Sequence, residues 1–321
     1  MADPVLTLRD VHVRYRAGGR VVRAVDGVDL EVDAGEVVAL VGESGCGKTS
    51  LIRSVIGLEP LAAGEVSCAG ERVGRSARGL RRLRRRAQMI FQDPTGALNP
   101  RQTVFAAVAE GIGIHRLPGE PRDLVVSALA RAGLRPPDRY LDRYPHELSG
   151  GQRQRVLIAG AIALAPQVLL ADEPVASLDA SIRGEILALI RHLVDTEGIA
   201  VVAVTHDLGL AWNIADRIAV MYLGRVVEVG PTEQVLSYPQ HPYTKALLSV
   251  VPEVEHVEPV ILAGEPPDPA RVPTGCRFHP RCPLVASGEA ERLGILAKCT
   301  GHDVALTHRT PTHAAACHAL A

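Results

Sequence analysis

Residues 42–49 read Gly42-Glu43-Ser44-Gly45-Cys46-Gly47-Lys48-Thr49 and match the pattern G-x-x-x-x-G-K-[ST]. Glycines at these positions allow the backbone to curl, so that successive amide N–H groups point inward at phosphate oxygens. A helix that begins at the end of such a loop adds the positive end of its dipole. In this pattern Lys48 reaches the β- and γ-phosphates, and the Thr49 hydroxyl ligates Mg²⁺. The sequence therefore predicts that this segment, the phosphate loop, binds a nucleoside triphosphate.

The segments on either side of the phosphate loop give the context that the pattern requires. Residues 36–41 are nearly all apolar, as expected of a strand that is buried on both faces. After the loop, apolar residues recur at helical spacing, as Leu51, Ile52, Val55 and Ile56. Because a strand precedes the loop and a helix follows it, an incidental glycine turn is the weaker interpretation.

The rest of the chain predicts an α/β fold with two additions. Residues 5–41 are rich in strand-like alternation, and the pattern of residues 96–165 is helical. Strand-like and helix-like runs then follow one another at residues 168–171, 182–194, 199–204, 208–214 and 218–222. This order predicts parallel strands joined by crossover helices, with an antiparallel β subdomain before them and a helical insertion between them. Beyond Gly230, frequent prolines predict an irregular C-terminal extension.

Composition excludes several classes of protein. The chain has 321 residues, of which 47% are hydrophobic and 22% charged, and its net charge of −1 argues against broad binding to nucleic acid. An arginine-rich run at residues 72–86 is interpreted as a solvated face rather than a nucleic-acid site.

We expect no signal peptide at the N-terminus, and the longest apolar stretch, at residues 156–165, is too short to span a bilayer. A membrane role would therefore depend on a partner.

An acidic segment, at residues 172–173, completes the predicted nucleotide site. Residues 168–171 form an apolar strand that runs into Asp172, Glu173 and Pro174. Asp172 is placed to hold Mg²⁺, and Glu173 to orient and polarise the attacking water. An acidic pair alone is ordinary and also favours the start of a helix. Its occurrence together with the phosphate loop makes the catalytic interpretation the stronger one.

A third motif, Leu148-Ser149-Gly150-Gly151-Gln152, precedes a helix-like segment and would form a second anion site. One nucleotide needs only one phosphate cradle, so this second site is informative. With it, the sequence resembles the ABC ATPase family from about residue 5 to the C-terminus. The resemblance implies that this motif caps the γ-phosphate of ATP bound by a partner subunit, across a head-to-tail dimer.

The resemblance extends to further positions, one at a time. Tyr15 resembles the aromatic residue that stacks on adenine, and the alternative of a strand core residue stays open. Gln92 resembles the glutamine that touches Mg²⁺ and relays nucleotide occupancy to the membrane partner, and His206 the histidine that contacts the γ-phosphate. Asp179, in Ser177-Leu178-Asp179, resembles part of the loop that crosses the dimer interface.

The resemblance thus implies four groups of site residues. The catalytic residues are Lys48, Glu173 and His206. The ATP-binding residues are Tyr15, Gly42, Glu43, Ser44, Gly45, Cys46, Gly47, Lys48, Thr49, Ser50 and Gln92. The residues that contact the partner's ATP are Ser149, Gly150, Gly151, Gln152 and Asp179. The Mg²⁺ ligands are Thr49, Gln92 and Asp172.

Three passages narrow the resemblance to the oligopeptide/dipeptide importer group, which includes nickel and glutathione importers. They lie at residues 91–100, 241–248 and 275–283. Residues 24–30 and the arginine-rich approach to Gln92 resemble the second ATPase subunit of that group. The resemblance implies an ABC ATPase domain at residues 5–230, with its helical insertion at about 96–165, and a peptide-transporter-type extension at 231–321. It also implies a second ATPase subunit (in a homo- or heterodimer), two membrane permease subunits and an extracytoplasmic substrate-binding protein, with this chain peripheral on the cytoplasmic face of the membrane.

Four of the six cysteines crowd the last fifth of the chain: Cys276, Cys282, Cys299 and Cys317. Without a secretory signal, such a cluster suggests a metal more than disulfides. Thiolates suit Zn²⁺ and iron–sulfur clusters alike, nearby histidines (His279, His302 and His318) keep zinc open, and unliganded buried cysteines are the third alternative. The resemblance implies a [4Fe–4S] cluster, although Cys299 lies farther from Cys282 than the family's pattern places its third cysteine.

Two rival hypotheses remain. A soluble ABC ATPase acting on ribosomes or DNA would carry tandem cassettes or long insertions, and neither is evident here. A metal or redox sensor with a vestigial cassette would not need Lys48, Ser149, Glu173 and His206 all to be intact.

Overall fold

A computed structural model describes residues 4–74, 76–251 and 259–320. The chain divides into two compact units. The first comprises Met1–Thr7, Glu31–Val37 and Val66–Val204, and the second Leu8–Leu30, Val38–Glu65 and Thr205–Ala321. The C-terminal extension therefore belongs to the same unit as the phosphate loop.

In the second unit, a strand buried along its whole length leads into the phosphate loop. This strand, β3 (Val37–Val41), pairs in parallel with β9 (Arg217–Tyr222), and its residues are all apolar and completely buried. β10 (Arg225–Pro231) pairs antiparallel with β9 and carries the sheet onward. Helix α1 (Lys48–Val55) begins directly after the loop. The predicted strand, glycine turn and helix are therefore present in that order.

Most of an antiparallel sheet also lies in the second unit, with β1 (Leu6–Ala17) between β2 (Arg20–Val32) and β4 (Ala63–Cys68). The buried face of β1 changes parity along the strand: Leu6 and Leu8 are buried, and then Val11 and Val13. Asp10 lies between these pairs at φ 47°. Side chains of a strand alternate between its two faces, so residues three apart, such as Leu8 and Val11, would normally lie on opposite faces. The irregularity at Asp10 adds one residue and so keeps these apolar side chains on the same face.

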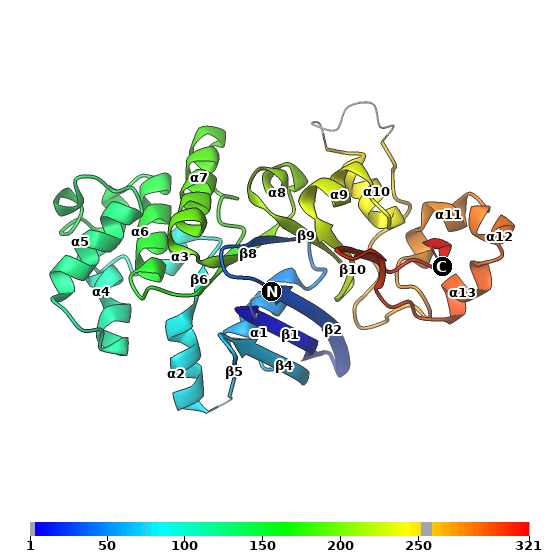
Figure 1. The fold of residues 1–321 in the computed structure, drawn as a ribbon, viewed down its shortest axis with the longest axis horizontal. Helices are drawn as coiled ribbons and strands as arrows, with labels where there is room; N and C mark the ends of the chain where they lie inside the picture. The colour runs from blue at the N-terminus through cyan, green and yellow to red at the C-terminus, as the bar shows by residue number, and fades with distance from the viewer. Residues whose placement is uncertain (1–3, 75, 252–258, 321) are drawn as a thin grey trace. The chain divides into compact units, whose positions relative to one another are not determined.

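The first unit contains a parallel sheet segment and the helical insertion. β7 (Val168–Asp172) pairs in parallel with β6 (Ala87–Ile90) and with β8 (Ala200–Thr205), and α7 (Ala180–Glu197) connects β7 to β8. Figure 1 shows three helices of the insertion, α4, α5 and α6, packed against one another. They span Val104–His115, Pro121–Arg131 and Gly150–Ile162, after a short α3 at Pro94–Ala97. The predicted α/β class, with crossover helices and a helical insertion, is confirmed.

The arginine-rich run of the first unit forms β5 (Glu71–Arg72) and α2 (Ala77–Arg86). Leu83 is the buried residue of α2, and Arg86 pairs with Glu71 at 3.1 Å. Four other arginines of the helix are exposed to solvent, namely Arg78, Arg81, Arg82 and Arg85.

The C-terminal extension returns to the sheet of its own unit. After α8 (Leu208–Ile214), β9 and β10, the chain forms α9 (Thr232–Ser237) and α10 (Pro242–Leu248). Four short helices follow, namely η3 (His279–Arg281), α11 (Pro283–Ala286), α12 (Glu289–Arg292) and α13 (Leu296–Gly301). The hairpin of β11 (Thr307–Thr310) and β12 (His313–Ala315) then extends the sheet, because β12 pairs antiparallel with β10.

The extension also contributes aromatic side chains to a hydrophobic core. Tyr243 and Phe278 are buried against Tyr222 of β9, with ring centroids 4.7 Å (Tyr222–Tyr243) and 5.1 Å (Tyr222–Phe278) apart. The frequent prolines beyond Gly230 predict irregular structure, and they do not predict this aromatic packing. Within the described residues, none of the helices has the length and apolar character needed to cross a membrane.

Candidate functional site

The phosphate loop is held in place by two glycines that no other residue could replace without moving the backbone. Gly42 has φ 150°, and a Cβ there would lie 2.2 Å from the Met221 carbonyl oxygen. Gly47 has φ 106°, and its Cβ would lie 2.0 Å from the Ala24 carbonyl oxygen. The loop therefore packs directly on the backbone of its own unit, which fixes its path before any ligand arrives.

Lys48 lies inside the loop rather than in solvent. Its side chain is buried, and its ammonium group donates hydrogen bonds to the carbonyl oxygens of Gly42 (2.7 Å) and Glu43 (2.9 Å). Cys46 is buried beside it, and burial raises the pKa of its thiol, so this cysteine stays neutral. The two carbonyl oxygens thus hold the Lys48 ammonium within the loop, where it can form charge-assisted hydrogen bonds to an anionic phosphate.

The predicted adenine-stacking residue lies on β1 and is half-buried. The Tyr15 hydroxyl donates a hydrogen bond to the Ser50 hydroxyl oxygen at 3.0 Å, one residue after Thr49. Burial raises the pKa of Tyr15 above its ordinary value. Tyr15 is neither fully buried nor fully exposed, and its stacking on adenine stays a prediction.

In the first unit, the acidic end of β7 and the segment after β6 come together. Asp172 is buried at the end of β7, and the Glu173 N–H donates to the Val204 carbonyl oxygen at 3.0 Å. The Gln92 side-chain amide donates to the Glu173 carboxylate at 3.0 Å. Glu173 has φ 45°, a conformation that costs a non-glycine residue about 1–3 kcal/mol and that concentrates at functional sites.

The Ser149 motif begins α6 with a capping box. The Ser149 hydroxyl accepts from the Gln152 N–H at 3.3 Å, and the Gln152 side-chain oxygen accepts from the Ser149 N–H at 3.0 Å. A Cβ on Gly151 would lie 2.7 Å from the Ile182 side chain, so a larger residue here would force Ile182 to shift. Ser149 and Gly150 are exposed at the start of the helix, where an anion could approach.

Two other predicted site residues lie at the ends of secondary-structure elements. Asp179 is the exposed N-cap residue of α7, and its side chain makes no capping hydrogen bond. His206 is exposed directly after β8, where the Asp207 N–H donates to the Thr205 hydroxyl oxygen at 3.0 Å.

The structure reveals two contacts to the phosphate loop that the sequence did not predict. The Glu43 N–H donates to the Tyr243 hydroxyl oxygen at 2.9 Å, and the Arg281 guanidinium donates to both Glu43 carboxylate oxygens at 2.7 and 3.1 Å. Tyr243 and Arg281 belong to the two passages, at residues 241–248 and 275–283, that were singled out only by resemblance. The resemblance of these two passages to a known family could have indicated that both residues are functional. No local sequence pattern, however, links either of them to Glu43.

The four C-terminal cysteines gather in the second unit. The pKa of the Cys276 thiol is raised to about 12, chiefly by burial, and the nearby thiols of Cys317, Cys282 and Cys299 contribute to this rise. His279 hydrogen-bonds through its ring to the Cys276 carbonyl oxygen at 2.9 Å. In the described part of the chain, however, no group of three or more Cys, His, Asp or Glu residues is arranged to hold a metal ion. The thiols are close enough to influence one another, yet in this arrangement they do not form a ligand set.

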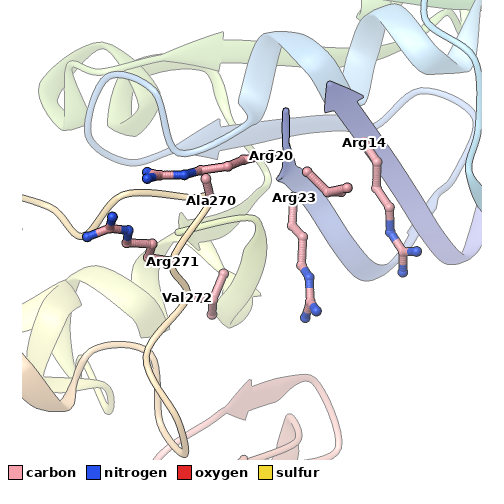
Figure 2. Close-up of a pocket in the computed structure, with 7 residues that line it drawn as sticks. Arg14, Arg20, Arg23, Ala270, Arg271 and Val272 are labelled. Atoms are coloured by element: carbon pink, nitrogen blue, oxygen red, sulfur yellow. The ribbon is translucent and has the colours of Figure 1, made fainter. Parts of the chain in front are cut away.

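A basic hollow of about 550 Å³ lies between β1, β2 and residues 270–272 of the same unit. Four arginines line it, namely Arg14, Arg20, Arg23 and Arg271. Figure 2 shows Arg14 and Arg23 directed to one side of the hollow, and Arg20 and Arg271 to another. The four guanidinium groups therefore do not converge on one point as they would around a single anion.

A glycine-rich loop after a buried parallel strand, an acidic strand end and a capped Ser-Gly-Gly-Gln helix start together define an ATP-binding cassette. The chain belongs to the ATP-binding proteins of the ABC transporter family. The model of the ABC transporter family matches residues 25–176, and that of the oligopeptide/dipeptide transporter C-terminal region matches residues 227–288. The resemblance inferred from the motifs is thereby confirmed, and the chain is an ATPase subunit.

Known proteins are similar in sequence to this chain over most of its length. The di/tripeptide transport ATP-binding protein DppF of Pseudomonas aeruginosa is 42% identical over 294 residues, covering 88% of this chain and 90% of that protein. The dipeptide transport ATP-binding protein DppF of Haemophilus influenzae is 44% identical over 267 residues, covering 81% of each. Among solved structures, cbiO1 from Clostridium perfringens, part of the ABC transporter complex cbiONQ, aligns with a TM-score of 0.66 at 31% identity, covering 74% of this chain and 92% of that one.

Proposed function

We propose that this chain energises a membrane importer of di- or oligopeptides by binding and hydrolysing ATP. The observation that carries the proposal is the combination, in one chain, of the cassette with the extension typical of oligopeptide/dipeptide transporters. The relatives that are 42–44% identical are named as dipeptide or di/tripeptide transport proteins. Nickel or glutathione is the alternative cargo, because importers of these share the same group.

In the proposed mechanism, each residue of the site has a physical task. Lys48 exchanges its two carbonyl partners for the β- and γ-phosphates, which compensate its buried charge more fully. Glu173 orients and polarises the attacking water, and its hydrogen bond from Gln92 fixes the direction of the carboxylate. A shift of the segment that carries Gln92 would then misalign Glu173, which provides a route by which a membrane partner controls hydrolysis. His206 would contact the γ-phosphate.

Magnesium suits the donors that the sequence assigns to it. Thr49, Gln92 and Asp172 offer oxygen atoms, the type of ligand that Mg²⁺ prefers, and Asp172 is a carboxylate at the end of β7. A bound Mg²⁺ would neutralise phosphate charge. The residues of this chain would hold and orient the nucleotide around it.

We further propose that two cassettes act together. The exposed start of α6, with Ser149, Gly150, Gly151 and Gln152, and the exposed Asp179 at the start of α7 would face the ATP of a second ATPase subunit. A related ATP-binding cassette, MJ0796, has been solved as a dimer in a post-hydrolysis state with ADP and Pi, at 30% identity and a TM-score of 0.64, covering 71% of this chain and 98% of that one. The second subunit would be a copy or a homologue, and the pair would lie on the cytoplasmic face of the membrane against two permease subunits served by an extracytoplasmic binding protein.

Reconstitution tests the proposed function. The chain, co-expressed with a second ATPase subunit and two permease subunits from the same genome, should purify as a complex. In proteoliposomes, the ATPase rate of this complex should rise severalfold when a dipeptide and the binding protein are added. Stimulation by Ni²⁺ or glutathione instead of peptides would favour the alternative cargo. Failure to associate with any membrane protein would contradict the transport role.

We also propose that the C-terminal extension binds a [4Fe–4S] cluster through Cys276, Cys282, Cys299 and Cys317. Four gathered thiols, one with a pKa of about 12, are a donor set of the right chemistry, because a bound metal would remove the cost of ionising them. To bind the cluster, the four thiols would have to move into a ligand arrangement. A structural role that fixes the short helices of the extension is the expected one.

Purification without oxygen tests this cluster. The protein should be brown and contain about four iron and four sulfide ions per chain, as expected of a four-thiolate cluster. Both should be lost in Cys276→Ser and Cys282→Ser and retained in Cys68→Ser, which alters a buried cysteine of β4. Colourless protein with stoichiometric zinc would support the zinc interpretation, and protein without any metal would leave the cysteines a packing role.

A further inference from the structure

We propose that Arg281 and Tyr243, both from the C-terminal extension, are positioning residues of the phosphate loop that act through Glu43. The inference rests on ATP binding at this loop and is independent of the cargo. All of the groups involved lie in the second unit of the chain. The extension would then be a part of the nucleotide site and not only an addition to the cassette.

Glu43 is held on three sides. Its carboxylate accepts two hydrogen bonds from Arg281, and its N–H donates to Tyr243. On the inner side of the loop, its carbonyl oxygen accepts from Lys48 at 2.9 Å. The Glu43 N–H shares its peptide group with the Gly42 carbonyl, which also accepts from Lys48, at 2.7 Å. The extension therefore fixes, from the outer side of the loop, a peptide group that binds the Lys48 ammonium on the inner side.

The Arg281–Glu43 pair is geometrically strong. It is bidentate, and only 7% of the Arg281 side chain and 28% of the Glu43 side chain is exposed. The hydrogen bonds to Glu43 raise the pKa of Arg281, so the guanidinium keeps its charge. Bidentate arginine–carboxylate pairs in partly buried sites define orientation as well as contributing energy.

Tyr243 is rigid because its ring is completely enclosed. The ring packs against Tyr222 and Phe278, with centroids 4.7 and 5.3 Å away. The Tyr243 N–H donates to the ring nitrogen Nδ1 of His241, the N-cap of α10, at 3.0 Å. A hydroxyl held in this way fixes the position of the Glu43 N–H, which therefore points outward from the loop.

The pairing has an electrostatic consequence for ATP. Glu43 places a carboxylate in the loop that must accept a triphosphate, and Arg281 compensates this charge. Removing the guanidinium would leave the carboxylate unpaired near the phosphates, and like charges at short range repel strongly outside bulk water. Neutralising Glu43 at the same time should remove this repulsion. This rescue is not expected if Arg281 serves only to stabilise the fold.

The experiment measures Mg-ATP affinity and steady-state ATPase kinetics of the full-length protein, purified without oxygen. Arg281→Gln should raise the Kd and KM for ATP by roughly tenfold, and Tyr243→Phe by roughly threefold, which are the effects of a lost charged and a lost neutral hydrogen bond. The value of kcat at saturating ATP should change less than twofold. The double variant Glu43→Gln/Arg281→Gln should recover most of the affinity lost in Arg281→Gln.

Two matched variants control for the substitutions themselves. Arg292→Gln and Tyr238→Phe change exposed residues of the same extension and should leave both Kd and KM unchanged. If Arg281→Gln does not fold, Arg281→Lys retains the charge but not the bidentate geometry and should give a smaller loss of affinity.

The proposal is overturned if Arg281→Gln and Tyr243→Phe bind ATP as the wild type does, even when their melting temperatures fall. It is also overturned if Glu43→Gln fails to rescue Arg281→Gln, because the two residues would then act independently. Absence of ATP binding in the wild-type protein would instead contradict the proposed function, so the two failures are distinguishable.

Discussion

Glu173→Gln should lower the rate of ATP hydrolysis by about 10²–10⁴-fold and leave ATP affinity within a fewfold of the wild type. The glutamine side chain keeps the shape of the glutamate and can still interact with Gln92, but its amide cannot polarise the attacking water. Backbone strain at this position, where φ is 45°, is unaffected because neither residue is glycine. The effect should therefore appear in kcat and not in the binding constant.

Single-turnover phosphate release and equilibrium ATP binding check this expectation. Glu110→Gln, on an exposed face of α4, is the matched control and should hydrolyse ATP at the wild-type rate. Because ATP would persist in the Glu173→Gln protein, size-exclusion chromatography with ATP should show a dimer, and this dimer should dissociate in ADP. Wild-type turnover by Glu173→Gln would show that the catalytic carboxylate lies elsewhere.

Lys48→Ala should reduce ATP affinity by about 100-fold or more, because charge-assisted hydrogen bonds to phosphate are each worth about 1.5–3 kcal/mol. The Lys48 ammonium now spans the loop, bonded to the Gly42 and Glu43 carbonyl oxygens. Its loss also removes both of these hydrogen bonds within the loop.

Isothermal titration calorimetry and the shift in melting temperature on adding Mg-ATP measure this loss. The exposed lysine of α13 offers a control, and Lys298→Ala should bind ATP as the wild type does. If Lys48→Ala binds ATP with unchanged affinity, the phosphate loop is not the site of the triphosphate.

The parts of the site that could be predicted are those whose chemistry is local in the sequence. The close approaches of Gly42 and Gly47 to the backbone leave no room for a side chain, so the glycines appear as a readable pattern. Ser149 and Gln152 likewise form their capping box within four residues. A pattern of this kind records a constraint between neighbours, and such constraints can be recognised from one sequence.

The contacts that could not be predicted join residues far apart in the chain. Glu43 is separated from Tyr243 by 200 residues and from Arg281 by 238. Hydrophobic periodicity predicts which face of an element is buried, but it does not predict which distant side chain covers that face. The irregularity at Asp10 was missed for a related reason, since one extra residue leaves no signal except a change of parity between Leu8 and Val11.

The buried carboxylate of Glu228 has a consequence for anyone who shortens this protein. Its oxygens accept hydrogen bonds from the N–H groups of Gln240 and His241 and from the His313 ring, each at 2.8 Å, and the side chain has no exposure to solvent. A cassette that ended at the close of β10 would retain this charge and lose every one of those partners, while the edge of β10 that now pairs with Ala314 and Ala315 would be bare. An unpaired sheet edge is a template for association with other chains, and a buried charge without partners lowers stability. We therefore expect a chain shortened to residue 231 to be less stable and to aggregate.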